Sequence, residues 1–321
     1  MAARRLISVV FHWFRTPPGR LGQICSVWPP TLPGRIEWDG NDPEFWLGQE
    51  DWLDRAGVDA ELLQTTSWFR ECFDAHLSVV RRPVGLLVGP PAVEPGGVPE
   101  SPEALGRLIE DYLSSIPRAG KEFLLVGGRV MVHLWVFSMT PEQRVFDYLQ
   151  RLRAACAYPL YLSVHPSWTH QGREGWDEKL VIFSGRNYLS TGRPIDPLDG
   201  VTVSIRPGFW STRKAEPFLP RQGGRPYRRA WRELAALGPD GPDKAVVVWN
   251  EKEEGSQLHP SVPVRHTAAE PPVTEHSWEH CAVLGLPSFV QSQDDRWGRG
   301  RRLYVRATRR GAARWKSQAA A

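Results

Sequence analysis

The stretch VVVWNEKEEGSQLHPS, residues 246–261, decides the fold class of this chain. It opens with the run 245–249, which is apolar on both faces, as is typical of a buried strand in a parallel sheet. Asn250, Glu251 and Glu254 follow that strand directly. In α/β barrels, the residues just past the carboxyl ends of the strands carry the chemistry. The stretch therefore predicts either an acid/base site at the rim of a barrel or a solvated acidic turn, two alternatives that spacing alone does not separate.

Strand-like and helix-like segments alternate along the rest of the chain, which favours βα units around a parallel sheet. Expected strands cover 7–11, 58–63, 84–88, 130–137, 158–164, 180–183, 201–205 and 245–249, and helices cover 44–56, 68–80, 141–157 and 226–237, with one more after an N-cap at Ser101. No glycine-rich phosphate loop follows any strand, so a closed (β/α)8 barrel is favoured over a doubly wound sheet. We expect one barrel domain with long βα loops over residues 1–290 and a flexible basic tail over 291–321.

The composition is that of a soluble globular protein, with 41% hydrophobic and 24% charged residues in 321. Much of the net charge of +4 comes from the segment 296–316, so the body gives no reason to expect a nucleic-acid partner. The apolar run LISVVFHWF near the N-terminus is too short to span a bilayer and lacks a cleavage site. We expect a cytoplasmic protein without a membrane span, unless an export signal lies upstream.

Histidines and tryptophans also follow predicted strands. His165 and Trp168 come after the strand 158–164, and Trp210 comes after the strand 201–205. Parallel strand ends face one cleft, so these side chains are candidates for sugar contacts at its rim. His133, His165 and His170 raise the alternative of a metal site. Nothing in their spacing makes them converge, and His133 is more simply a buried, hydrogen-bonded residue, so neither a metal nor another cofactor is expected.

The run NEKEEGSQLHP resembles the NEWHEGTQIEP signature of the glycoside hydrolase family 99-like barrels, the endo-α-mannosidases and their relatives, which overlap with WbsX-like proteins. Other segments resemble the same barrels in the same order: VVFHWFRTPP is similar to their opening strand, and RQGGRPYRRAWRELAALGPD to the helix before the signature. The resemblance covers roughly residues 7–261.

The resemblance implies a retaining glycosidase that cleaves α-mannoside-type or related polysaccharide linkages. Glu251 would deprotonate the 2-hydroxyl of the sugar, and Glu254 would protonate the leaving oxygen. A pair of glutamates three positions apart on one strand end differs from the usual arrangement of carboxylates on separate strands. Asn250 can orient a sugar or a carboxylate with its amide. Substrate contacts are expected from residues of the two matching segments, namely His12, Trp13, Gln257 and His259.

The sequence departs from the family signature at several positions. Lys252 and Glu253 replace its tryptophan and histidine, and Phe11 and Phe14 replace two opening tyrosines. A lysine that points inward would favour the ionised form of both glutamates and oppose the acid role, whereas one that points outward would not. The alternative to a glycosidase is therefore a non-hydrolytic, carbohydrate-binding barrel associated with polysaccharide assembly.

Overall fold

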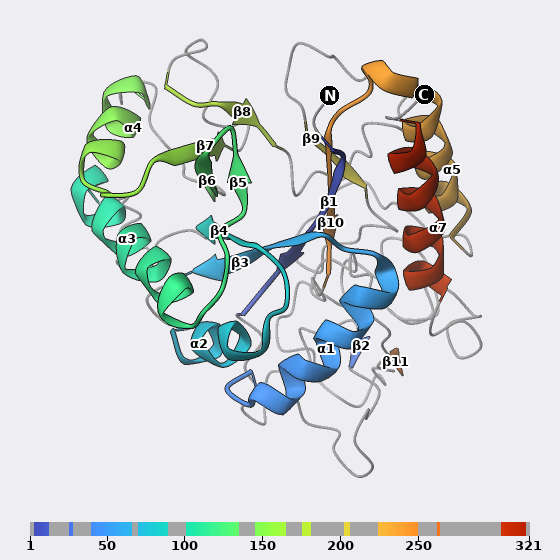
Figure 1. Ribbon diagram of the computed structural model, residues 1–321, viewed down its shortest axis with the longest axis horizontal. Coiled ribbons are helices and arrows are strands. Elements are labelled where there is room, and N and C mark those ends of the chain that lie inside the picture. Colours follow the sequence, from blue (N-terminus) through green and yellow to red (C-terminus); the bar gives the residue numbers. More distant parts are fainter. Residues whose placement is uncertain are drawn as a thin grey trace, which may run out of the picture.

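The computed structural model of the chain describes residues 3–12, 26–27, 40–65, 70–88, 101–134, 145–164, 175–180, 202–205, 224–249, 262–263 and 303–318. Within these ranges, eight parallel strands form one curled sheet in the order β8, β7, β6, β4, β3, β1, β10, β9 (Figure 1). Their bounds are β1 Arg5–Val10, β3 Ala60–Thr65, β4 Val84–Val88, β6 Arg129–Leu134, β7 Leu160–Val164, β8 Glu178–Lys179, β9 Thr202–Ile205 and β10 Lys244–Val248.

Each strand lies beside a neighbour in sequence, and β10 returns to pair with β1, with Val246 opposite Ile7. This order is the one that successive βα units produce in a barrel. The predicted α/β class with a parallel sheet is confirmed. The two edges of the described sheet are β8 and β9.

Side chains of the strands alternate between two buried faces, which explains why the strands read as continuous apolar runs. On one face, residues such as Leu6, Leu63 and Val247 belong to the cluster that includes the helices. On the other face, Ile7, Leu62 and further strand residues pack mainly against one another on the concave side. The two faces account for the two buried layers of the core.

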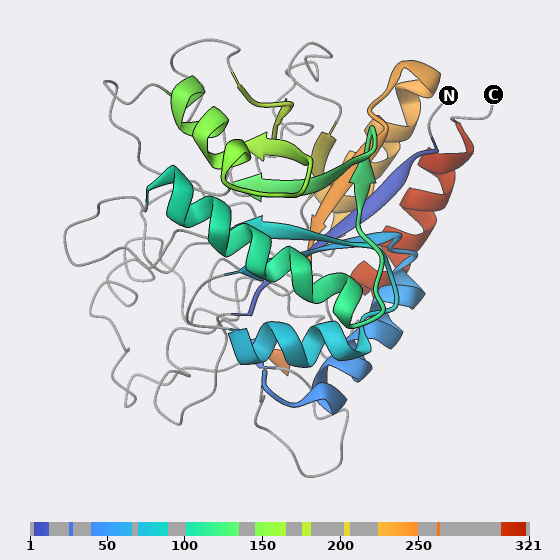
Figure 2. The same cartoon turned by 60° about the vertical axis from the view of Figure 1, so that its left-hand side comes forward.

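Six helices in the described ranges lie around the outside of the curled sheet (Figures 1 and 2). They are α1 Pro43–Ala56, α2 Arg70–Val79, α3 Pro102–Arg118, α4 Val145–Ala154, α5 Arg225–Ala236 and α7 Leu303–Ser317, and a 3-10 turn, Gly238–Asp240, follows α5. The α1 helix ends at Gly57, whose φ of 75° is a left-handed cap, and Ser101 caps α3 by accepting from the Ala104 N–H. Both ends agree with the prediction.

A β-hairpin leads into the strand β6. The strand β5, Leu125–Val126, pairs antiparallel with β6 through Gly127 and Gly128, which have φ of 56° and 77°. Positive φ at both turn positions is the geometry for which glycine is suited. These two glycines therefore form the turn of the hairpin.

The C-terminal segment differs from the flexible basic tail expected over 291–321. Leu303–Ser317 forms the helix α7, which packs between α5 and α1. Its Trp315 is fully buried, and the Thr308 hydroxyl lies 2.7 Å from the Tyr227 hydroxyl of α5. Gly311 lies against the Trp231 ring so closely that a Cβ would come within 2.3 Å of it. The apolar stripe on one side of α7 outweighs its many arginines and fixes the helix against α5 and α1.

Side chains connect the edge strand β8 with β10, the strand next to the opposite edge. The Lys244 ammonium of β10 lies 3.3 Å from the Glu178 carboxylate of β8, and both residues are buried. The Tyr161 hydroxyl of β7 donates to the same carboxylate at 3.1 Å. An ion pair therefore spans from β8 to the strand beside the opposite edge.

No helix in the described part of the chain is both long and apolar enough to cross a membrane.

Candidate functional site

The predicted site residues follow the carboxyl ends of β1, β7, β9 and β10 in the sequence. Because these strands are parallel, their carboxyl ends meet at one edge of the sheet. His12 lies within the described residues. The remaining predicted site residues lie outside them, and these are Trp13, His165, Trp168, Trp210, Asn250, Glu251, Glu254, Gln257 and His259.

A second, two-stranded sheet ties together the segments that follow β1 and β10. It pairs β2, Ser26–Val27, with β11, Val262–Pro263, and Val262 lies opposite Val27. Residues 13–25 connect β1 to β2, and residues 250–261 connect β10 to β11. Since β1 also pairs with β10, the two segments start side by side and end side by side.

The last described residues before these segments are held firmly. The Trp249 indole N–H donates to the Gln49 side chain of α1 at 2.7 Å, and both residues are buried. The His12 backbone N–H donates to the Gln64 side chain of β3 at 2.8 Å. The strand ends just before Asn250 and Trp13 are therefore fixed by buried hydrogen bonds.

The His12 side chain lies between the sheet and the helices α1 and α2. It is buried, and its ring meets those of Trp46 and Phe73 edge to face, with centroids 5.1 and 6.0 Å away. Its Nδ1 lies 2.7 Å from the Gln64 carbonyl oxygen, and its Nε2 lies 3.2 Å from Nδ1 of His76. Both ring nitrogens have protein partners, so the sugar contact expected of His12 is not part of the function proposed below.

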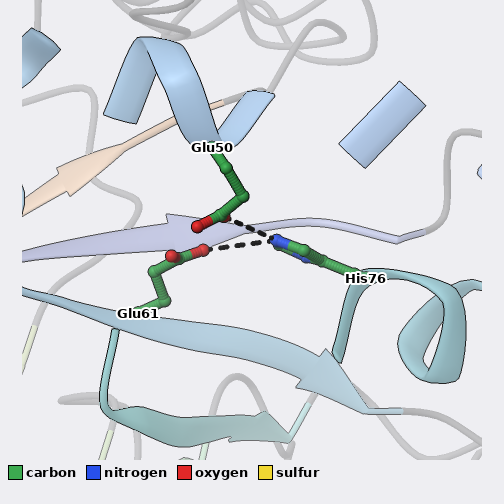
Figure 3. A group of neighbouring side chains, drawn as sticks. All are labelled: Glu50, Glu61 and His76. Atoms are coloured by element: carbon green, nitrogen blue, oxygen red, sulfur yellow. Dashed lines mark hydrogen bonds and ion pairs between the residues drawn. The ribbon is translucent and has the colours of Figure 1, made fainter. Parts of the chain in front are cut away.

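The His12 ring contacts a buried ionic cluster made of Glu50, Glu61, His76 and Arg82. Figure 3 shows that Glu50 of α1, Glu61 of β3 and His76 of α2 point toward one another. The His76 Nε2 lies 3.2 Å from a Glu50 oxygen and 3.4 Å from a Glu61 oxygen. The Arg82 guanidinium donates to both carboxylates, at 2.7 and 2.9 Å. The four charged side chains come from α1, β3, α2 and the connection between α2 and β4, so the cluster joins four segments of the chain.

Burial and hydrogen bonding shift the pKa values of the two histidines in opposite directions. Burial alone would lower the pKa of His76, but hydrogen bonds to Glu50 and Glu61 and their negative charges outweigh it and raise the pKa to about 9. Burial, together with the charge of His76, lowers the pKa of His12 to about 3. At neutral pH, His76 is thus an imidazolium and His12 a neutral imidazole.

These charge states fix where the ring protons lie. His76 donates from Nε2 to Glu50 and from Nδ1 to the Nε2 of His12. His12 in turn donates from Nδ1 to the Gln64 carbonyl. The hydrogen bonds therefore run without interruption from the carboxylates to the backbone at the carboxyl end of β3.

The two carboxyl groups of the cluster are also unequal. Burial and the neighbouring charge of Glu61 raise the pKa of Glu50. Burial would likewise raise the pKa of Glu61, but hydrogen bonds and charges from His76 and Arg82 outweigh it and lower the value. The cations His76 and Arg82 thus face the two buried carboxyl groups, and Arg82 also pairs with Asp54, which is the kind of pairing that burial of ionisable groups requires.

The residue types of the cluster are also those of a metal site. Ligand atoms of Glu50, Glu61 and His76 lie within 4.8 Å of one another. A metal needs the neutral, unprotonated imidazole, whereas His76 is held as an imidazolium, and Arg82 already donates to both carboxylates. Arg82 and His76 supply the positive charge that a cation would bring, so the arrangement fits a structural ion-pair network better than a metal centre.

His133 has the structural role expected of it. It is buried in β6, and its Nδ1 lies 2.9 Å from the Ser163 hydroxyl. The ionic cluster, by contrast, has no counterpart among the sequence predictions. The one local indication of the cluster in the sequence is Glu61, a glutamate inside the buried strand AELLQT. A buried strand accommodates a charged side chain only when other segments supply partners for it.

The fold is similar to that of two solved structures of the GH99 endo-α-mannosidase from Bacteroides thetaiotaomicron. The TM-scores are 0.65 for the complex with Bis-Tris-propane and 0.64 for the other structure, and each comparison has 14% identity and covers 99% of both chains. A solved structure described as a glycoside hydrolase-like protein matches with a TM-score of 0.50 and 11% identity, over 82% of this chain and 91% of that one. The resemblance predicted from the sequence is thus confirmed at the level of the fold.

No protein-family model matches the sequence, and no curated protein matches it either.

Proposed function

We propose that this chain is a retaining glycoside hydrolase of α-mannoside-type or related polysaccharide linkages, with Glu251 and Glu254 as its catalytic pair on a closed (β/α)8 barrel whose helical layer includes α7. The observation that carries the proposal is the double pairing of β1 with β10 and of β2 with β11, which brackets residues 13–25 and 250–261. The fold shared with endo-α-mannosidase structures supports the same assignment.

In the proposed reaction, Glu251 removes the proton of the sugar 2-hydroxyl, and O2 forms a bond to the anomeric carbon as the bond to the leaving oxygen breaks. Glu254 gives its proton to that oxygen. Water then attacks the anomeric carbon on the face from which the leaving group departed and gives its proton to Glu254. The bond between O2 and that carbon breaks, O2 takes back its proton from Glu251, and the configuration is retained overall. Each glutamate must hold the protonation state its step needs near neutral pH, and burial or a neighbouring charge is the means of achieving this.

The remaining predicted contacts belong to substrate binding. We propose that Trp13, Trp168 and Trp210 stack against sugar faces, because aromatic rings bury apolar sugar surface at little entropic cost. Asn250, His165, Gln257 and His259 would hydrogen-bond sugar hydroxyls. No cofactor enters this reaction, and the partner is an oligo- or polysaccharide.

Turnover of α-mannosyl oligosaccharides by the full chain tests the proposal. Product release is expected from the wild type, and Glu254→Gln should lower the rate by at least about a hundredfold, the contribution typical of general acid catalysis. Glu253→Gln is the matched control, since it removes a carboxylate one position away and should leave the rate within a few-fold. An aryl α-mannoside whose leaving group needs no proton should recover activity in Glu254→Gln but not in Glu251→Gln.

The second candidate is a carbohydrate-binding barrel without hydrolysis. The observation that favours it is Phe11, which stands where the family has a tyrosine and is fully buried in the concave cluster without a hydroxyl to offer. No turnover on a broad panel of α-linked glycans, with calorimetric binding retained, would support this candidate over the hydrolase.

A further inference from the structure

Positive charge is concentrated on two neighbouring helices at the outside of the fold. The α5 helix holds four arginines and one glutamate, and α7 holds four arginines and one lysine, which together give a net charge of +8. The whole chain has a net charge of only +4, so all other residues together are net negative. The charge of this protein is therefore polarised toward one part of its surface.

The two helices form one continuous surface. They lie side by side in Figures 1 and 2, and they pack through Tyr227 and Trp231 of α5 against Tyr304 and Trp315 of α7. The earlier residue of α5 contacts the earlier residue of α7, and the later residue contacts the later one, so the two helices run in the same direction. Buried aromatic rings thus hold the two rows of arginines at a fixed distance.

The arginines point away from this packed side. The exposed ones form what we call the basic face, made up of Arg225, Arg229, Arg232, Arg306, Arg309, Arg310 and Arg314. Among the described residues, Arg229 of the basic face forms an ion pair with Glu233 of the same helix, at 2.6 Å. Lys316 turns the other way and pairs with Asp59 at 2.5 Å. Most of the basic face thus lacks a carboxylate partner within the described part of the protein.

We propose that the basic face binds an acidic polysaccharide, a flexible chain that presents carboxylates or sulfates at regular intervals. Arginine forms paired hydrogen bonds with such oxyanions, and two fixed rows of arginines match the repeated charges of a linear polyanion. This surface lies on the helical layer, away from the concave side of the sheet, and binding there requires no turnover. The proposal therefore stands apart from the catalytic one.

Charge alone would also suit nucleic acids or anionic membranes, but the residues of these helices favour a polysaccharide. The aromatic rings of α5 and α7 that the structure describes, Tyr227, Trp231, Tyr304 and Trp315, are all buried, so none is available to stack on bases. Of the large exposed apolar side chains of the described residues, Leu47, Leu125, Phe146 and Leu237, a single one adjoins these helices, namely Leu237 at the C-cap of α5. Insertion into a lipid surface needs such residues.

The test is binding of polygalacturonate and of sulfated dextran to the full chain, measured by calorimetry at low salt, with unsulfated dextran as the uncharged control. The triple variant Arg306→Gln, Arg310→Gln, Arg314→Gln should weaken polyanion binding roughly ten-fold or more. The matched control removes three exposed arginines from α3 and α4, as Arg107→Gln, Arg118→Gln, Arg151→Gln, and should bind within about two-fold of wild type. All substituted side chains are exposed, so circular dichroism and thermal melting should be unchanged.

Binding of both polyanions that weakens with salt and with the α7 variant supports the proposal. It is overturned if the wild type binds neither polyanion, or if the two triple variants behave alike. Tighter binding to duplex DNA, or to vesicles containing phosphatidylserine, than to the polysaccharides would assign the face to a different partner and would overturn it as well. Loss of hydrolysis with polyanion binding intact would count only against the catalytic proposal.

Discussion

The contacting pair His12 and His76 should make the stability of this protein depend on pH in a bell-shaped manner. The pKa of His76 is raised from 6.5 to about 9, so its stabilisation is fully present below pH 6.5 and is lost as pH rises through 9. The pKa of His12 is lowered to about 3, so its stabilisation is present above pH 6.5 and declines as pH falls below that value. Together they place a stability maximum near pH 6.5.

The size of each effect follows from about 1.4 kcal/mol per pKa unit. Raising the pH from 6 to 9.5 should remove about 3 kcal/mol through His76, and lowering it from 6.5 to 4.5 should remove about 2 kcal/mol through His12. On the acid side, the lowered pKa of Glu61 adds to this loss, whereas the raised pKa of Glu50 opposes it. On the alkaline side, burial raises the pKa of the Cys156 thiol, which adds a loss that wild type and a His76 variant share, so the difference between the two isolates His76.

His76→Gln isolates that group, because it keeps a neutral donor near Glu50 and removes the positive charge. Urea unfolding of wild type and variant between pH 6 and pH 9.5 gives the cost of the substitution at each pH. The cost should be largest at pH 6 and smaller by about 3 kcal/mol at pH 9.5, where the wild-type imidazolium has lost its proton. An equal cost at both pH values would refute the assignment of His76 as a buried cation.

Three further substitutions probe the packing of the sheet and the helices. Trp315→Ala should cost about 3–5 kcal/mol in thermal or urea unfolding, because it empties a fully buried site against Trp231, and a cost below about 1 kcal/mol would mean that α7 is not docked. Gly85→Ala should cost roughly 1–3 kcal/mol, since its Cβ would meet the Met131 carbonyl oxygen at 2.6 Å; an unchanged melting temperature would contradict that close approach. Lys244→Met should cost about 3–5 kcal/mol by leaving the Glu178 carboxylate buried without its lysine, and Lys244→Met with Glu178→Gln should recover much of it; a double variant as unstable as the single one would count against the pair.

Local chemistry made much of the fold predictable from sequence. The end of α1 at Gly57, the cap at Ser101 and the strand at 84–88 all follow from signals within a few residues. The alternation of strands and helices also predicts a parallel sheet, because chain order and handedness leave few other arrangements. These features depend on interactions between residues close in sequence, so short stretches of the sequence are enough to predict them.

The C-terminal helix shows why a charge run can mislead. Its arginines read as a solvated tail, yet Tyr304, Thr308, Gly311 and Trp315 recur at the spacing of one helical face. That stripe was present in the sequence, and its partner on α5 gives it a place to dock. The hydrophobic face decided the structure, and the charge only decided which side remained exposed.

The ionic cluster was beyond prediction for a different reason. Glu50, Glu61, His76 and Arg82 come from four segments, and no spacing within the sequence makes their side chains converge. Only the packing of α1 and α2 against β3 brings them within hydrogen-bonding distance. The catalytic pair is in the opposite situation, since the NEKEEG run proposes it from sequence while Glu251 and Glu254 lie outside the described residues.

The decisive experiment on Glu251 and Glu254 is a crystal structure of the Glu254→Gln variant with a bound α-mannosyl oligosaccharide. We expect the sugar at the carboxyl ends of β1 and β10, with the Glu251 carboxylate within hydrogen-bonding distance of the 2-hydroxyl and residue 254 beside the glycosidic oxygen. A sugar bound elsewhere, or residue 251 or 254 turned toward bulk solvent in that complex, would contradict it.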